Sequence, residues 1–79
     1  MKKLTGFKKG ETCHIKSIQG DSRFIGRISS MGLTTDSEIQ IVQNGFGMPM
    51  LLFSHDTLIA ISKKEAGRIM AQKIEESYE

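Results

Sequence analysis

The sequence contains a single cysteine, Cys13, followed directly by a histidine, His14. A thiol beside an imidazole is a starting point for nucleophilic catalysis, which also needs a third group that orients the base. The alternating pattern around the pair predicts a β-strand, in which neighbouring side chains point to opposite faces. His14 therefore cannot readily activate Cys13, and we interpret the cysteine as a buried structural thiol.

A second group of chemically capable residues is the pair His55 and Asp56, which joins Cys13 and His14 as the only candidates for ligands of Fe²⁺. A metal site needs three or more converging donors, and the sequence has no HxxxH or CxxC spacing that sets two donors on one face. We therefore expect no metal site and no cofactor, and we interpret His55 as an exposed turn residue.

Other catalytic patterns are also missing. Asp36 and Glu38 flank an expected turn, where solvation and turn hydrogen bonds explain them. The segment Gly45-Phe46-Gly47 lacks the lysine and the following helix of a phosphate-binding loop. The sequence thus predicts no catalytic residue, no small-molecule substrate and no enzyme.

Length and composition restrict the fold. Seventy-nine residues suffice for one small domain and exclude a large enzyme architecture. With 38% hydrophobic and 25% charged residues, the chain has the composition of a folded globular protein. One cysteine indicates a reducing compartment, and no apolar run reaches the length of a signal peptide or membrane span. We expect a cytoplasmic protein without membrane insertion.

Charge is unevenly distributed along the chain. Residues 1–27 contain seven Lys or Arg, whereas residues 28–62 contain none. The basic end suggests an alternative role in nucleic-acid binding through Lys2, Lys3, Lys8, Lys9, Lys16, Arg23 and Arg27. Only Phe7 and Phe24 lie among these charges, and the apolar stripe of the expected helix places Phe24 in the core. The aromatic side chains that a single-strand binder places between its basic residues are therefore missing.

The first half of the chain predicts one strand and one short helix. Alternation over residues 12–19 favours a strand with a bulge or bend near Ser17. Ser22 is the expected helix N-cap, because its hydroxyl can accept from the first turn. Gly32 supplies the left-handed exit of this helix, and Leu33 should pack after it.

The second half predicts a three-stranded meander over residues 38–42, 50–53 and 57–61. Asn44-Gly45 favours a type I′ hairpin turn, because both residues tolerate positive φ. Residues 54–56 form a second tight turn.

The C-terminal part begins with Ser62 and Glu65 at capping-box spacing. Residues 69–74 fit either a continued helix or a final strand. We expect one domain over residues 1–74 and a frayed charged tail over 75–79. The predicted fold is mainly β: a small SH3-like barrel of about five strands, with one short helix between the first two strands and a helical turn near the C-terminus.

Two surfaces are candidates for binding a partner. On the helix, Arg23, Gly26, Arg27 and Ser30 fall opposite the apolar stripe, so a partner could approach closely while two guanidinium groups reach carboxylates. The second surface comprises Phe46, Met48 and Pro49, followed by Met50, because large apolar groups at a loop tip are costly to solvate unless they dock. Alternatively, Phe46 and Met50 fold back over an open barrel end.

Several short motifs follow one another in a recognisable order. Leu4–Glu11 matches the pattern L-x-x-L/F-K-x-G-E. Arg27–Leu33 resembles R-L-x-x-M/L-G-L, with Ile28 in place of Leu, and Thr57–Ile61 resembles x-x-I-A-L, with Ile61 in place of Leu. The series runs from Leu4 to about Ile74 and resembles the FeoA proteins and the related SH3-like domains that end iron-dependent repressors of the DtxR type. The chain departs from this pattern in turns, with Thr35-Asp36 where the family often has Pro-Gly, and with Asp56 in place of Gly.

This resemblance implies a function that the residues alone do not give. A FeoA-like protein would be a non-enzymatic cytoplasmic accessory protein of bacterial ferrous iron uptake, acting by contact with the GTPase part of the membrane transporter FeoB. The alternatives are a nucleic-acid-binding barrel, which the aromatic pattern does not favour, and an iron-responsive regulatory domain. The sequence leaves the oligomeric state and the docking surface open.

Overall fold

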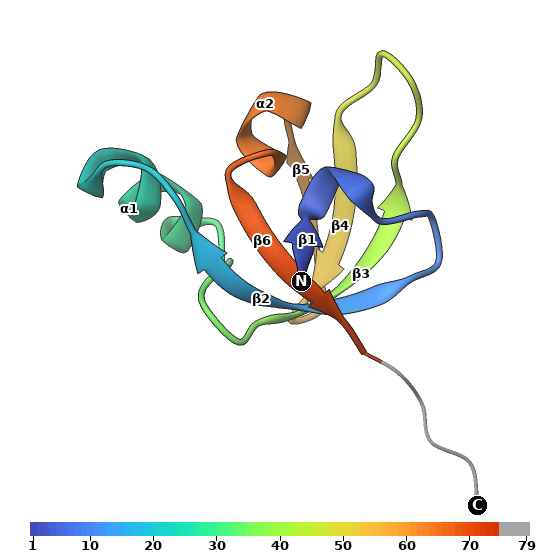
Figure 1. Ribbon diagram of the computed structural model, residues 1–79, viewed down its shortest axis with the longest axis horizontal. Helices are drawn as coiled ribbons and strands as arrows, with labels where there is room; N and C mark the ends of the chain where they lie inside the picture. Colours follow the sequence, from blue (N-terminus) through green and yellow to red (C-terminus); the bar gives the residue numbers. More distant parts are fainter. Residues whose placement is uncertain (75–79) are drawn as a thin grey trace, which may run out of the picture.

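The computed structural model describes residues 1–74, which form one mainly β unit. In this part of the chain six strands make a single antiparallel sheet in the order β1-β6-β2-β3-β4-β5 (Figure 1). The elements are β1 Lys2–Lys3, the 3-10 turn η1 Leu4–Gly6, β2 Thr12–Ile18, α1 Ser22–Ser30, β3 Glu38–Gln43, β4 Met50–Ser54, β5 Thr57–Ile61, α2 Lys63–Ala66 and β6 Ile69–Lys73. The predicted mainly β, SH3-like fold is confirmed, and the short strand β1 is an addition to it. The predicted tail over 75–79 lies outside the described residues.

The first and last long strands pair with each other. β2 pairs with β6 with a register shift between Ile15 and Ser17, which confirms the expected irregularity near Ser17. This pairing also decides residues 69–74 in favour of a strand, because Ile69 and Ala71 are buried in alternation opposite Ile18 and Ile15 of β2. The sequence could not choose between helix and strand, since the deciding partner lies far away along the chain.

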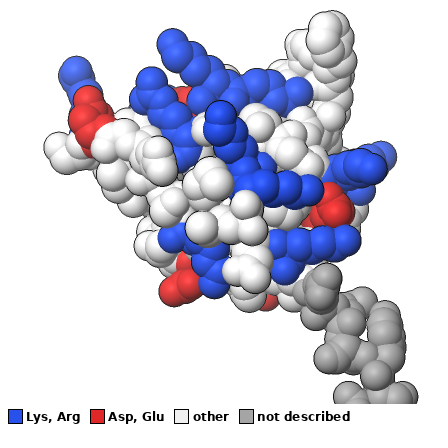
Figure 2. Space-filling model, in the orientation of Figure 1, with Lys and Arg blue, Asp and Glu red and all other residues white. Residues whose placement is uncertain are grey.

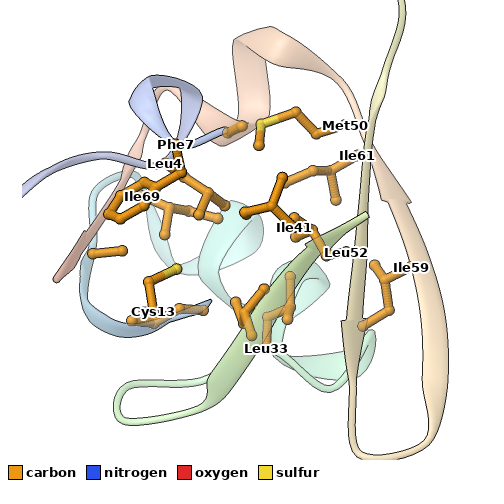
Figure 3. Packing of buried hydrophobic residues seen from close by; sticks show 14 of the residues in the cluster. Leu4, Phe7, Cys13, Leu33, Ile41, Met50, Leu52, Ile59, Ile61 and Ile69 are labelled. Atoms are coloured by element: carbon orange, nitrogen blue, oxygen red, sulfur yellow. The ribbon is translucent and has the colours of Figure 1, made fainter. Parts of the chain in front are cut away.

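The core fills the inside of the curved sheet (Figure 3). Alternate residues of β2 to β6 point into it, and α1 adds Phe24 and Ile28. Leu4 and Phe7, at either end of the segment containing η1, are also buried. The result is one continuous apolar cluster, which holds α1 and η1 against the sheet.

Helix α1 begins one residue earlier than predicted. Asp21, not Ser22, is the N-cap, and its Oδ1 accepts a hydrogen bond from the Phe24 N–H at 2.9 Å. The prediction of Ser22 was wrong because two good capping residues are adjacent, and the apolar stripe does not resolve one position. At the other end, Gly32 has φ 97° and Leu33 is fully buried, as expected.

The two hairpins of the meander differ from the prediction in one important way. The β3–β4 connection spans residues 44–49, and neither Asn44 nor Gly45 has a positive φ, so the predicted type I′ turn there is wrong. Positive φ at both central residues occurs instead at His55 (51°) and Asp56 (59°), between the paired residues Ser54 and Thr57. The left-handed geometry explains why Asp stands at a position where the FeoA pattern has Gly.

Helix α2 is short and capped at its start. Ser62 Oγ accepts from the Glu65 N–H at 3.1 Å, and Glu65 Oε1 accepts from the Ser62 N–H at 2.9 Å, which confirms the capping box. Neither helix within residues 1–74 has the length and apolar character required to span a bilayer.

Candidate functional site

The first candidate surface, called the helix face here, consists of Arg23, Gly26, Arg27 and Ser30. All four residues are exposed on α1, whereas Phe24 and Ile28 are buried on the opposite side. The helical spacing of the apolar residues therefore predicted correctly which side of α1 faces solvent.

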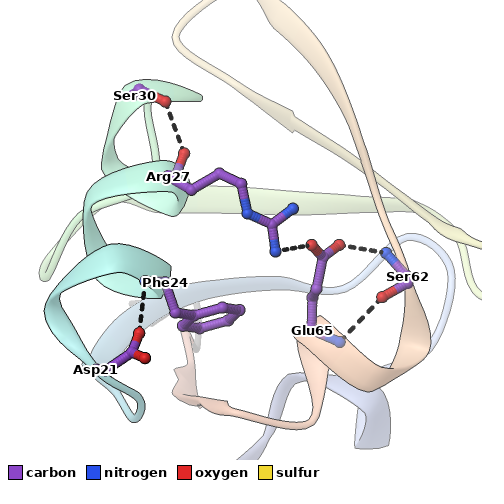
Figure 4. A network of polar contacts seen from close by, with 6 residues as sticks. All are labelled: Asp21, Phe24, Arg27, Ser30, Ser62 and Glu65. Carbon is purple, nitrogen blue, oxygen red and sulfur yellow. Dashed lines mark hydrogen bonds and ion pairs between the residues drawn. The ribbon is translucent and has the colours of Figure 1, made fainter.

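Within the helix face, Arg27 is already engaged by the protein itself. Its guanidinium pairs with Glu65 of α2 and lies 5.8 Å from the centre of the Phe24 ring (Figure 4). Ser30 Oγ donates to the Arg27 carbonyl at 2.7 Å. Arg27 therefore ties α1 to α2, and of the two arginines Arg23 is the one with no ion pair among residues 1–74.

The carboxylate of Glu65, which pairs with Arg27, also accepts a hydrogen bond from the backbone of Ser62. The pKa of Glu65 is lowered, mainly because its carboxylate accepts the Ser62 backbone hydrogen bond, and further because Arg27 bonds to it. Glu65 is thus charged at neutral pH, and the α1–α2 ion pair is present there.

Gly26 leaves open space at the centre of the helix face. A Cβ atom at this position would meet nothing within 4 Å, and Gly26 does not have a positive φ. The fold therefore does not require glycine at 26, where alanine would be the better helix former. An approaching surface can come closer to the α1 backbone here than at any side-chain-bearing position.

The second candidate surface is carried by the β3–β4 loop, residues 44–49. Asn44 Nδ2 donates to the carbonyls of Thr5 (3.0 Å) and Phe7 (2.6 Å), and Lys63 Nζ donates to the Gly45 carbonyl at 2.7 Å. These contacts fix the start of the loop to η1 and α2. They also give Asn44 a role that replaces the predicted turn.

Beyond these contacts the loop presents apolar side chains to solvent. We call Phe46, Met48 and Pro49 the loop tip: Phe46 is fully exposed, Met48 is 47% exposed, and Pro49 is exposed. Met50 is completely buried. The alternative in which the loop folds back is therefore correct for Met50 and wrong for Phe46, whose side chain is left without a protein contact that removes it from water.

The residues considered for metal binding do not come together. Cys13 is buried, whereas His55 and Asp56 occupy the exposed β4–β5 turn. Among residues 1–74 there is no group of three His, Cys, Asp or Glu side chains placed to hold a metal ion.

Cys13 is also a poor nucleophile. Burial raises the pKa of its thiol to about 11, with a further contribution from the nearby charge of Glu11. The thiol is therefore protonated at neutral pH, and the reactive thiolate is suppressed. The interpretation of Cys13 as a buried core residue is confirmed.

Basic side chains spread over the face that carries β1, β6 and α2 (Figure 2). Several of them are paired internally: Lys73 with Glu11 at 3.2 Å, and Lys16 with Asp36 at 4.0 Å. Phe7 and Phe24 are both buried, so neither can stack on a nucleotide base. The aromatic part of a single-strand binding surface is thus missing here.

Sequence reasoning missed the contacts that hold both surfaces in place. The Arg27–Glu65 pair and the bonds of Asn44 and Lys63 join residues that are distant in sequence. The capping box gave a signal for the position of Glu65, but nothing local pointed to its arginine. The exposed apolar pair Phe53 and Leu58 on the outer face of the sheet was also not anticipated.

The FeoA domain model matches residues 2–73. The chain belongs to the FeoA family. No curated protein sequence matches it significantly.

Solved structures of FeoA proteins share the fold over nearly the whole chain. The crystal structure of an iron uptake regulatory protein (FeoA) is 28% identical, with a TM-score of 0.85, and the match covers 90% of this chain and 95% of that one. A FeoA-like protein from Clostridium acetobutylicum is 22% identical, with a TM-score of 0.82 and coverages of 99% and 92%.

The fold is also shared with part of a metal-dependent repressor. A manganese-dependent transcriptional repressor is 16% identical, with a TM-score of 0.84, and the match covers 92% of this FeoA-family chain but 41% of the repressor. At this identity the likeness concerns the fold alone. The resemblance stated from sequence motifs, to FeoA proteins and to repressor domains, is thereby confirmed.

Proposed function

We propose that this FeoA-family protein is a cytoplasmic, non-enzymatic accessory protein of ferrous iron uptake, which acts by contact with the GTPase part of an FeoB-like membrane transporter. Family membership supports the link to iron uptake. The observation that carries a contact mechanism is the anchored loop with Phe46 fully exposed at its tip.

The anchoring matters because a partner gains most from a side chain that is already in position. Asn44 and Lys63 fix the base of the loop before any partner arrives, so less backbone conformational entropy remains to be lost on binding. An exposed aromatic side chain that fills a pocket is the typical centre of a binding hot spot. Methionine beside it adapts to the shape of the partner.

The non-enzymatic part of the proposal has its own support. The thiol of Cys13 is buried and protonated, and the residues considered for metal binding do not converge within residues 1–74. The nucleophile–base–orienter arrangement that covalent catalysis needs is not assembled around Cys13.

The double variant Phe46→Ser, Met48→Ser tests the loop tip. Because both side chains are exposed, we expect unchanged thermal stability, loss of co-purification with the transporter's GTPase part, and loss of Fe²⁺ uptake in cells that depend on the transporter. Phe53→Ser is the matched control, since Phe53 is 40% exposed on another surface. Normal uptake by the double variant would exclude the loop tip, and normal uptake after deletion of the protein would refute the transport role.

Gly26→Leu tests the helix face without removing any contact. The added side chain meets no protein atom at its Cβ, so the variant should fold normally. If a partner packs against α1, its affinity should fall at least tenfold, whereas Ser22→Leu at the start of the helix should have little effect. Unchanged affinity with Gly26→Leu would remove α1 from the contact surface.

A regulatory-domain role is the second candidate, because the manganese-dependent repressor contains the same fold with a TM-score of 0.84. Such a domain would respond to the metal itself. Titration of the purified protein with Fe²⁺ or Mn²⁺, followed by calorimetry, separates the two candidates: stoichiometric binding would favour the regulatory role, and its absence would favour the transporter contact.

A further inference from the structure

Strand β5, Thr57–Ile61, ends the sheet within residues 1–74, and one of its sides is unpaired. The two-residue turn sets Ser54 opposite Thr57, and hydrogen-bonded pairs alternate along an antiparallel ladder. Thr57, Ile59 and Ile61 therefore bond to β4. The backbone N–H and C=O groups of Leu58 and Ala60 point away from the sheet, and no other backbone group in the described chain bonds to them.

This edge has none of the usual protection. Proteins shield a free edge with charged side chains, proline or a bulge, because an open edge accepts another strand. The segment Thr57–Ile61 contains no charge and no proline, and it pairs with β4 without a bulge. Its outward side chains are Leu58, which is 59% exposed, and Ala60, which is also exposed.

The apolar surface continues from the edge onto the neighbouring strands. Phe53 of β4 lies directly opposite Leu58 and is 40% exposed. Together with Val42 of β3 they line a shallow, mostly apolar groove on the outer face of the sheet. A strand added at β5 would extend this face and shield Leu58.

We propose that a second copy of this chain pairs with β5 in antiparallel orientation, so that the two sheets become continuous across a two-fold axis. Pairing Ile59 with Ile59 of the second copy matches all five residues of each strand. It also places Leu58 beside Ala60 of the other copy, a large side chain next to a small one. A register centred on Leu58 pairs only three residues.

Charge at the two ends of β5 identifies a second copy as the occupant. Asp56 immediately precedes the strand, and Lys64 follows it in the first turn of α2. An antiparallel copy brings the acidic start of one strand to the basic end of the other, and it does so at both ends of the interface. Both charges are available for this contact, because Asp56 and Lys64 take part in none of the ion pairs of residues 1–74.

The first test measures self-association by analytical ultracentrifugation over a range of concentrations. Ala60→Pro removes an outward N–H and leaves the β4–β5 ladder intact, because proline is tolerated at an edge position whose N–H faces solvent. We expect the dimer dissociation constant to rise at least tenfold. Circular dichroism and thermal melting check that the variant is folded, and Leu58→Lys, which keeps the backbone donor but adds charge, should weaken the dimer in the same direction.

The second test examines the antiparallel register. Lys64→Glu should weaken the dimer, because it sets a second carboxylate near Asp56 of the other copy. Asp56→Asn removes that repulsion and keeps a residue that tolerates the positive φ at this position. In the Asp56→Asn background, Lys64→Glu should therefore have a clearly smaller effect, which is a coupling that only neighbouring residues show.

Three results would overturn the proposal. The first is a wild-type protein that stays monomeric up to about 1 mM, a concentration that corresponds to a binding free energy of only about −4 kcal/mol. The second is a dimer whose dissociation constant does not rise with Ala60→Pro, and the third is an equal effect of Lys64→Glu with Asp or Asn at position 56. A monomer whose binding to another protein is lost with Ala60→Pro would assign the edge to that protein and refute self-pairing. The residues that define this interface do not include the loop tip, which carries the proposed function, so failure here leaves that function untouched.

Discussion

Strands β3–β5, in which Glu38 is the one charged residue, and the basic remainder of the molecule are held in place by different interactions. Residues 39–54 and 57–62 contain no Asp, Glu, Lys or Arg. The three ion pairs of the described chain therefore lie elsewhere, and each has at least one substantially exposed side chain. The uncharged part is fixed instead by hydrogen bonds from side chains to backbone carbonyls, such as those of Asn44.

This difference predicts where stability resides. An exposed ion pair contributes only about 0–1 kcal/mol, because water and salt screen it. Removing the donor of a part-buried carbonyl lowers the unfolding free energy by more, because the carbonyl is then left without a hydrogen bond from either the protein or water. The unfolding free energy should therefore fall more when a hydrogen-bonding side chain of the uncharged region is removed than when a member of an ion pair in the basic region is removed. Three predictions test this contrast.

The largest effect is expected for Asn44→Ala. The substitution removes the donor that serves both the Thr5 and the Phe7 carbonyls, and we expect a loss of about 1–3 kcal/mol of unfolding free energy. Urea denaturation measures it. Gln43→Ala is the control, because its bond to the Pro49 carbonyl is long (3.4 Å) and exposed. Equal losses in the two variants would show that Asn44 is no special anchor.

The next effect separates two glycines of the same loop. Gly47 has φ 72°, so Gly47→Ala should cost about 1 kcal/mol through backbone strain. Gly45 has no such φ, and an added Cβ would meet the flexible Met48 sulfur at 3.4 Å. Gly45→Ala should therefore be nearly neutral, as thermal melting of both variants can show. A larger loss of stability with Gly45→Ala than with Gly47→Ala would instead favour the tight turn at Asn44-Gly45.

The smallest effect belongs to the Arg27–Glu65 ion pair. Arg27→Ala should lower stability by less than about 1 kcal/mol at neutral pH. The folded-state pKa of Glu65 is lowered, so its contribution is present above the unfolded pKa of about 4.3 and is lost as pH falls through the lowered value. Glu65→Gln should therefore weaken the acid dependence of unfolding. A loss as large as that of Asn44→Ala would contradict the contrast between the two regions.

The sequence could predict what depends on residues close together in the chain. The exposed side of α1, the capping box at Ser62, the exit at Gly32 and the strand 57–61 were all predicted correctly. Each rests on a period or a hydrogen bond that spans at most four residues. The exposure of Arg23, Gly26, Arg27 and Ser30 follows from the same period.

The errors share a cause in competition between local options. Ser22 and Asp21 are both suitable caps, and only the path of the chain places the carboxylate over the Phe24 N–H. Asn44-Gly45 is a strong local turn signal, yet the Asn44 amide finds two carbonyls 39 and 37 residues away. A single-sequence pattern has no means to weigh such a distant partner.

The sequence by itself determined the small mainly β domain, its family and the solvent-facing side of α1, because alternation and helical spacing depend only on residues close together in the chain. Only the tertiary structure decided that β6 is a strand, that the loop base is anchored while Phe46 is left exposed, and that β5 has an open edge. Those features depend on which backbone groups meet across the sheet, and hydrogen-bond partners far apart in the chain are chosen only when it folds.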